Sequence, residues 1–141
     1  HISNFQLLIR QSNMLTLKIQ NQIRDAEARA LATTGSNGVN VVPVSVVNVT
    51  DTEIHLYDFF MGKTVANLQA EPAVALTAWS GLSGIQVKAM TTYVTDGDVF
   101  AAAKTEMLER FPERTLSGII VLAPTAVYDI SAGATAGMKI A

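Results

Sequence analysis

The amino-acid sequence predicts a mainly β domain, an antiparallel barrel with a few flanking helices. Segments with strand-like patterns outnumber those with helical spacing. Most of the predicted strands are joined by short turns, and the helical crossovers that parallel strands need are missing. The length of 141 residues is typical of one domain, and a hydrophobic content of 49% provides enough apolar side chains for a core.

The N-terminal segment has helical periodicity. Apolar side chains recur at helical spacing over residues 4–27, and Ser12 or Asn13 could cap a second start, so one or two helices are expected. Core packing explains this stripe, and a second apolar stripe would also suit a partner subunit. We expect residues 1–13 to form an N-terminal extension or helix, 14–131 the domain, and 132–141 a C-terminal tail.

The rest of the chain alternates between strands and turns. A strand over 30–34 ends at the hairpin signal Gly35-Ser36-Asn37-Gly38. Residues 39–49 contain seven valines in eleven positions, which predicts one strand covered on both faces. The elements expected after it are strands over 53–58, 73–79, 85–95 and 116–130, a helix over 63–70, and a helix that opens at residues 95–98.

Composition excludes several classes of function. A net charge of -2 argues against a general nucleic-acid binder. The absence of cysteine excludes disulfides, thiol catalysis and zinc-thiolate sites, and two histidines are too few for a metal site built on several imidazoles. No apolar run approaches the roughly 20 residues that cross a bilayer. We therefore expect a cytoplasmic protein without a bound metal, nucleic acid or membrane.

The clearest chemical signal is Phe60-Met61-Gly62-Lys63-Thr64, between a predicted strand and a short helix. Free N–H groups at a helix start attract anions, and Lys63 and Thr64 add a charge and a hydroxyl, a set that suits a terminal phosphate. A nucleotide-hydrolase P-loop would need glycine where Tyr57 stands, so that alternative fails. The other interpretation of Lys63 is a solvated charge at a helix start.

Two further positions stand out on predicted strands. Pro43 cannot donate to a sheet ladder, so it marks an edge, a bulge or a gap where a flat ligand could use free backbone groups, with Ser45 on the same face. Gln86 and Lys88 share one face of a strand, which is either a solvent face or the lining of a site. His55 has no acid–base partner nearby in sequence, and Trp79 suits the core or an interface.

Taken in order, these segments resemble the pyridoxamine 5'-phosphate oxidase-like group of FMN-binding split barrels, which includes small FMN-binding proteins. The resemblance covers about residues 14–131. It rests on the segments Ala30 to Gly38, Val42 to Val47, Tyr57 to Thr64, Asn67-Leu68, Glu71 to Leu76, Gln86 to Lys88, and Tyr93 to Gly97.

This resemblance implies a six-stranded antiparallel split β-barrel that forms a homodimer, with FMN in a groove at the subunit interface. It assigns Lys63 and Thr64 to the phosphate and Gln86 to a glutamine that holds the flavin. The remaining cofactor-binding residues that it implies are Pro43, Val44, Ser45 and Val46 along the ring, and Asp58, Phe59, Phe60, Met61 and Gly62 beneath the ring and ribityl chain.

The resemblance also limits the function. The vitamin oxidase itself has an arginine on the flavin-lining strand and a C-terminal arginine- and histidine-bearing segment, neither of which this sequence shows, so we do not expect vitamin B6 oxidation. We expect an FMN-dependent oxidoreductase with a small-molecule electron donor or acceptor. The alternatives are a non-catalytic flavin carrier or sensor, and a deazaflavin-dependent reductase. The sequence names no catalytic residue and no substrate.

Overall fold

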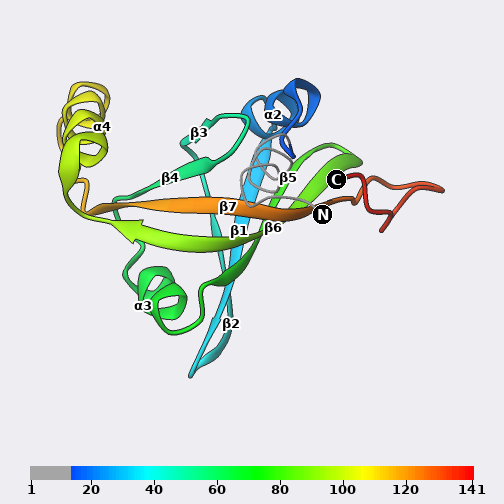
Figure 1. The fold of residues 1–141 in the computed structure, drawn as a ribbon, viewed down its shortest axis with the longest axis horizontal. Helices are drawn as coiled ribbons and strands as arrows, with labels where there is room; N and C mark the ends of the chain where they lie inside the picture. The colour runs from blue at the N-terminus through cyan, green and yellow to red at the C-terminus, as the bar shows by residue number, and fades with distance from the viewer. Residues whose placement is uncertain (1–13) are drawn as a thin grey trace, which may run out of the picture.

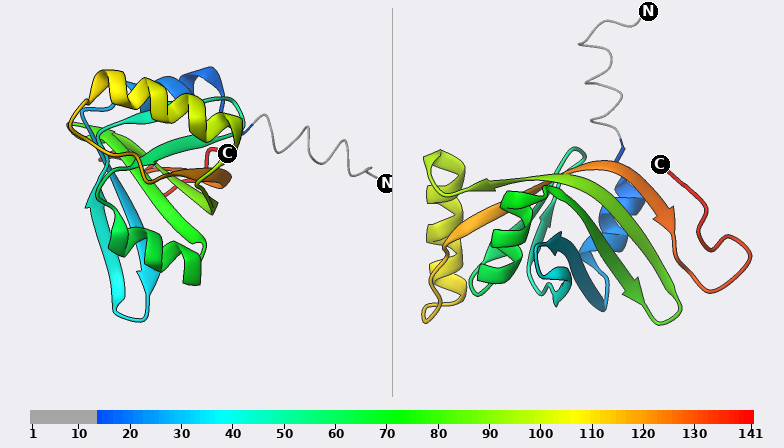
Figure 2. Two further views of the ribbon diagram at one scale, coloured as in Figure 1. Left: turned by 90° about the vertical axis from the view of Figure 1, so that its left-hand side faces the viewer. Right: turned by 90° about the horizontal axis from the view of Figure 1, so that it is seen from below.

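One curled antiparallel sheet dominates the fold. The computed structural model describes residues 14–141 and places seven strands in a single sheet, in the order β2-β1-β5-β6-β7-β4-β3. Figures 1 and 2 show β6 and β7 as an arch, with α2 and α3 on its concave side and α4 at one end. The strands are β1 (Ala28–Gly35), β2 (Gly38–Pro43), β3 (Val47–Val49), β4 (Ile54–Asp58), β5 (Ala73–Ser80), β6 (Ser83–Val94) and β7 (Gly118–Asp129). The predicted mainly β antiparallel class is confirmed, with seven strands where six were expected.

The additional strand arises in the valine-rich segment, where the prediction of one strand over 39–49 is wrong. Strand β2 ends at Pro43 and β3 begins at Val47. Proline has no N–H group and cannot continue the ladder. Strands β2 and β3 are the two edges of the sheet, and the few residues between them span at most about 14 Å. Residues 44–46 therefore bring the two edges together and nearly close the barrel.

The predicted hairpins and the proline positions agree with the ladder. Gly35 pairs with Gly38 across a two-residue turn, and Gly38 has a φ of 91°, a conformation that favours glycine. Strands β5 and β6 pair from Ala73 to Ser80 across a similarly tight turn. In the interior strand β7, Pro124 lies where the register with β6 shifts at Lys88/Ala89. This bulge explains how a central strand accommodates a proline.

The described part of the chain contains three helices, α2 (Leu17–Arg24), α3 (Gly62–Ala70) and α4 (Gly97–Arg110). Helix α2 accounts for the second part of the predicted helical region 4–27, and residues 4–13 of that region lie outside the described residues. Thr16 caps the start of α2, where its hydroxyl accepts from the N–H of Ile19, and Asp25 is the C-cap. The buried residues of α2 are Ile19 and Ile23, one turn apart. The expected caps Ser12 and Asn13 lie outside the described residues. Within residues 14–141, no helix combines the length and hydropathy required to cross a bilayer.

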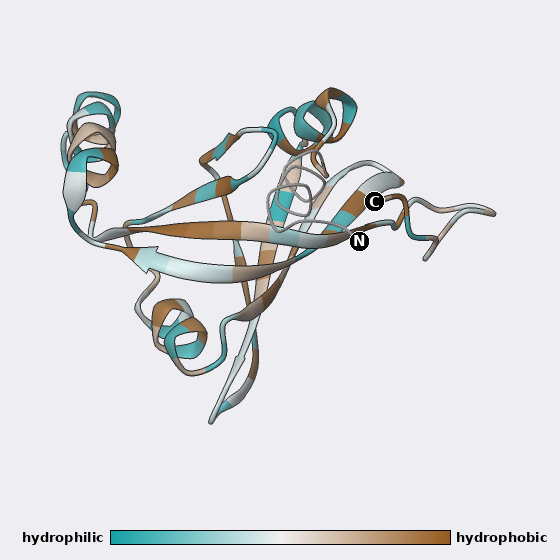
Figure 3. Cartoon of the chain, viewed as in Figure 1, coloured by the Kyte–Doolittle hydropathy of each residue, from teal (hydrophilic) through white to brown (hydrophobic). Residues whose placement is uncertain are grey.

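Strand β7 separates two hydrophobic clusters. Its first half is apolar along its length (Figure 3), and alternate residues face opposite sides. Ile120 and Leu122 pack into the main core inside the arch, with α2 and α3. Ile119 packs on the other side, against Ala103 and Met107 of α4. Helix α4 therefore covers the outer face of the sheet only at this end.

The predicted C-terminal tail folds back along β7. The N–H of Val127 donates to the carbonyl of Ala141 at 2.8 Å, and Tyr128 forms a β-bridge with Lys139. Asp129 organises the intervening loop because its carboxylate accepts from the N–H of Ser131 and the hydroxyl of Thr135. Residues 138–141 thus add backbone hydrogen bonds to the edge of the barrel opposite α4.

Candidate functional site

A groove of about 360 Å³ lies where the two edges of the sheet meet. The segment between β2 and β3 forms one wall, and the turn after β4 forms the other. Most of its lining is apolar, and the lining residues are Val42, Pro43, Val44, Ser45, Val46, Tyr57, Phe59, Phe60, Met61 and Arg114. Seven of the predicted cofactor-binding residues, Pro43 to Val46 and Phe59 to Met61, are therefore brought together.

The first wall presents free backbone donors. The N–H of Val44 donates to the carbonyl of Arg29, so this residue still belongs to the β1 ladder. Among the described residues, the N–H groups of Ser45 and Val46 have no hydrogen-bond acceptor. Ser45 is exposed and Val46 is partly exposed, so these two N–H groups are open to solvent and remain available to a polar atom placed in the groove.

The side chain of Arg29 stabilises this wall. Its guanidinium donates to the carbonyl of Ser45 and to the carbonyls of Ile23 and Arg24 at the end of α2. It forms no ion pair with a carboxylate of residues 14–141, and its Nε atom is buried without a partner there. Burial lowers the pKa of the Arg29 guanidinium from its ordinary value. The Arg29 side chain therefore links the end of α2 to the groove wall.

The second wall depends on Asp58, which does not line the groove. Asp58 is 5% exposed, and each of its carboxylate oxygens accepts a hydrogen bond. Oδ1 accepts from the N–H of Met61 at 2.8 Å, and Oδ2 accepts from the hydroxyl of Tyr93 at 2.5 Å. Burial, followed by the hydrogen bond and the charge of Asp58, raises the pKa of the Tyr93 hydroxyl well above its usual range. The turn 58–61 is thus fixed from below, leaving Phe60 83% exposed at the surface.

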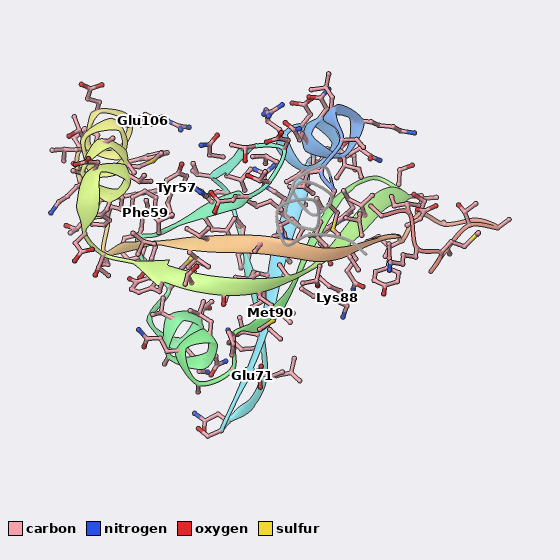
Figure 4. All side chains as sticks on the ribbon, viewed as in Figure 1. Tyr57, Phe59, Glu71, Lys88, Met90 and Glu106 are labelled. Carbon is pink, nitrogen blue, oxygen red and sulfur yellow. The ribbon has the colours of Figure 1, made fainter. Side chains whose placement is uncertain are left out.

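Arg114 is a groove residue that the sequence analysis missed. Its guanidinium lies 4.4 Å from the ring centre of Phe111 and 5.4 Å from that of Phe59. The two rings meet edge to face with centroids 5.7 Å apart. Figure 4 shows Tyr57 and Phe59 beside α4. No local motif marks Arg114, because it reaches the groove only through the packing of the segment that follows α4.

The start of α3 adjoins the groove at Met61. Met61 is the N-cap residue and provides no side-chain cap. The N–H groups of Gly62, Lys63 and Thr64 therefore lack the acceptors that residues inside a helix have. Lys63 is exposed, and a Cβ atom placed on Gly62 would meet nothing within 4 Å, so the surface is open here. Thr64, by contrast, is 1% exposed, and its hydroxyl accepts from the side-chain amide of Asn40.

Gln86 lies far from this groove within one protomer. It shares the outer face of β6 with Lys88, as predicted, while the alternate residues Ile85 and Val87 are buried. It is seven residues from Tyr93, the β6 residue that contacts Asp58, which corresponds to roughly 23 Å along the strand. Figure 4 shows Lys88 at a distance from Tyr57 and Phe59. One subunit does not bring Gln86 to the groove.

The remaining polar candidates stay apart from the groove. The ring of His55 lies 3.2 Å from the carboxylate of Glu53, two residues before it, so the expectation that His55 has no acid–base partner nearby in sequence is wrong. Trp79 is 37% exposed on the outer face of β5. Residues 14–141 form no group of three or more histidine, aspartate or glutamate side chains that could hold a metal ion. The polar side chains that line the groove are those of Ser45, Tyr57 and Arg114.

Comparison with known proteins decides the family. Residues 15–135 match the sequence profile of the family described as pyridoxamine 5'-phosphate oxidase. The chain belongs to this family. An uncharacterized family relative from Methanocaldococcus jannaschii is 30% identical over 116 residues, covering 79% of this chain and 78% of that protein.

Solved structures share the fold of this family member. HupZ from Group A Streptococcus superposes with a TM-score of 0.75 at 19% identity, covering 88% of this chain and 100% of that chain. An FMN-binding protein from Syntrophomonas wolfei superposes with a TM-score of 0.74 at 20% identity, covering 92% of this chain and 95% of that chain. The expected split-barrel fold is confirmed.

Proposed function

We propose that this member of the pyridoxamine 5'-phosphate oxidase family binds FMN in the groove and acts as a flavin-dependent oxidoreductase. The observation that carries the proposal is the pairing of an apolar groove with the unused N–H groups of Ser45 and Val46. A flavin ring is flat and largely apolar, and its edge carries acceptors that need donors to orient it. The similarity to a solved FMN-binding protein supports the same assignment.

The start of α3 suits the FMN phosphate. Three N–H groups without helical acceptors and the ammonium of Lys63 lie next to Met61, at the edge of the groove. A phosphate dianion binds such donors through charge-assisted hydrogen bonds. Thr64 would contribute its backbone N–H, because its hydroxyl is buried against Asn40.

A second copy of the chain would complete the site. The outer face of the sheet leaves Val39 76%, Val41 61% and Met90 45% exposed. The register places Val41, Ala32, Ala75 and Lys88 in one row across four strands, and the two alanines leave a shallow hollow on this face. A face of this kind suits burial in a homodimer. Gln86 lies on it, so the dimer would offer Gln86 of the second subunit to the flavin.

FMN, when bound, supplies hydride and electron-transfer chemistry. The protein's part would be to orient the ring against residues 43–46, to shield one side with Phe59 and Met61, and to hold the phosphate at α3. A non-catalytic flavin carrier is the second candidate, because the groove offers few polar side chains and no evident proton donor near neutral pH. Stopped-flow mixing with NADH or NADPH separates the two: rapid flavin reduction supports the oxidoreductase, and inert bound FMN supports the carrier.

The binding proposal is tested by an absorbance spectrum of the purified protein and by mass identification of any released ligand. Stripped protein is then titrated with FMN, riboflavin and a deazaflavin. We expect a flavin spectrum and the tightest binding for FMN. Colourless protein that also gains no thermal stability from added FMN would refute flavin binding, and preference for the deazaflavin would assign the other cofactor.

A further inference from the structure

Residues of three strands contact one another beneath the start of α3. Tyr93 of β6 reaches over Gly118 of β7 to the carboxylate of Asp58 at the end of β4. A Cβ atom on Gly118 would lie 2.3–2.7 Å from atoms of the Tyr93 side chain, so the glycine makes the crossing possible. The carbonyl of Asp58 also accepts from the N–H of Ser117 at 2.9 Å.

This arrangement fixes the backbone N–H of Met61 at the start of α3. The second oxygen of the Asp58 carboxylate accepts from the N–H of Met61, the N-cap residue, whose own side chain makes no cap. The carbonyl of Met61 accepts from Val65 and so sets the direction of the first helical turn. The orientation of the free N–H groups of Gly62 and Lys63 therefore depends on Asp58, and the orientation of Asp58 depends on Tyr93.

We propose that Asp58 and Tyr93 form a positioning pair that aims the start of α3 at the phosphate of the cofactor. The inference rests on the proposed FMN function and deepens it. Asp58 then acts through the backbone rather than by touching the flavin, because both of its oxygens are already occupied and the residue is buried. The pair sets the preference for a phosphorylated flavin over one without a phosphate.

The test compares the affinities of stripped protein for FMN and riboflavin, measured by quenching of flavin fluorescence. Tyr93→Phe removes the hydroxyl that holds Asp58. We expect it to weaken FMN binding about tenfold while changing riboflavin binding less than about twofold. The matched control is Thr91→Val, at a position on the same strand and face as Tyr93 but away from Asp58. This change removes the hydrogen bond of 2.8 Å from the Thr91 hydroxyl to the carbonyl of Pro72. It should leave the ratio of the two affinities unchanged.

Variants of Asp58 provide a second test of the positioning role if Tyr93→Phe folds poorly. Asparagine can keep both links, because its amide oxygen accepts from Met61 and its amide nitrogen donates to the Tyr93 hydroxyl. We expect Asp58→Asn to retain the FMN preference and Asp58→Ala to lose it. An equal loss for FMN and riboflavin in Tyr93→Phe, or no loss, would overturn the positioning role. Wild-type protein that binds neither flavin would instead refute the proposed function itself.

Discussion

Nη2 of Arg29 donates a hydrogen bond of 2.7 Å to the backbone carbonyl of Ser45. Nη1 of the same side chain donates to the carbonyl of Ile23 at 2.9 Å, at the end of α2. A cation at the C-terminal end of a helix also interacts favourably with the helix dipole. One side chain thus connects α2 to the wall that offers free N–H groups to a ligand.

Replacing Arg29 by methionine tests this connection. Methionine keeps an apolar stem of similar length and leaves the carbonyls of Ser45 and Ile23 without their donor. We expect the free energy of unfolding to fall by about 1–3 kcal/mol, since hydrogen bonds from charged groups lie in this range. We also expect weaker binding of FMN and riboflavin alike, because this is the wall that we propose to face the ring. Urea unfolding and flavin titration measure the two effects.

Arg24→Met is the control for Arg29. Arg24 is exposed and donates to the carbonyl of Val49 in β3, outside the groove. Its replacement should reduce stability less and leave flavin affinity unchanged. Equal losses of flavin affinity in the two variants would show that Arg29 has no special relation to the wall.

Lys63→Ala tests the phosphate site. We expect the Kd for FMN to rise about tenfold or more, because a charge-assisted hydrogen bond contributes about 1.5–3 kcal/mol, and the Kd for riboflavin to stay within about twofold. Lys104→Ala, which removes a lysine of α4 that lies over Phe100, serves as the control and should change neither value. Unaltered FMN affinity in Lys63→Ala would exclude Lys63 from the phosphate site.

Gly35 is required by close packing rather than by its backbone conformation. A Cβ atom there would lie 2.1 Å from Oδ1 of Asn67, whose side chain also donates to Thr33 and so attaches α3 to β1. We expect Gly35→Ala to lower the free energy of unfolding by about 1–3 kcal/mol in chemical denaturation. Gly62→Ala, where a Cβ atom meets nothing within 4 Å, should show little loss of stability. Equal stability of the two variants would contradict the packing role.

The C-terminal loop should respond to acid. Hydrogen bonds from Thr135 and then from Ser131 lower the pKa of the Asp129 carboxyl below its ordinary value. A carboxyl with a lowered pKa in the folded state stabilises that state above the unfolded pKa of about 3.9 and stops doing so as the pH falls through the folded value. We expect the Ser131 amide to lose protection from hydrogen exchange as the pH falls from about 3.9 through the lower pKa of the folded state. Asp129→Asn should abolish this pH dependence, and an unchanged profile would exclude Asp129 as its source.

Much of the fold follows from local patterns. The Gly35 to Gly38 turn, the alternation in β4 and the Gly-Lys-Thr helix start each predict the element that forms, because turn chemistry and periodicity act over short distances. The end of α2 and the interruption of the strand after Pro43 are not set by local patterns alone. The valines favour a continuous strand, and Pro43 marks only an interruption; the closure of the sheet and the hydrogen bond from Arg29 to Ser45 make residues 44–46 a connection between two edge strands.

In the candidate site, too, some features follow from local sequence and others depend on tertiary contacts. Pro43 to Val46 and Phe59 to Met61 are contiguous segments, so their placement in one groove could be expected from the family resemblance. The participation of Arg114 could not, because it depends on how the segment after α4 packs against Phe59. The buried role of Asp58 depends on Tyr93, which is distant in sequence and reaches it only across β7.

The most direct measurement is a crystal structure of the protein grown with FMN. We predict the ring against residues 43–46, with the N–H of Ser45 or Val46 donating to its edge, the phosphate on the amides of Gly62 and Lys63, and Gln86 of a second subunit within hydrogen-bond distance of the flavin. A flavin bound elsewhere, or one whose phosphate contacts Arg114 while the start of α3 stays open to solvent, would contradict the account.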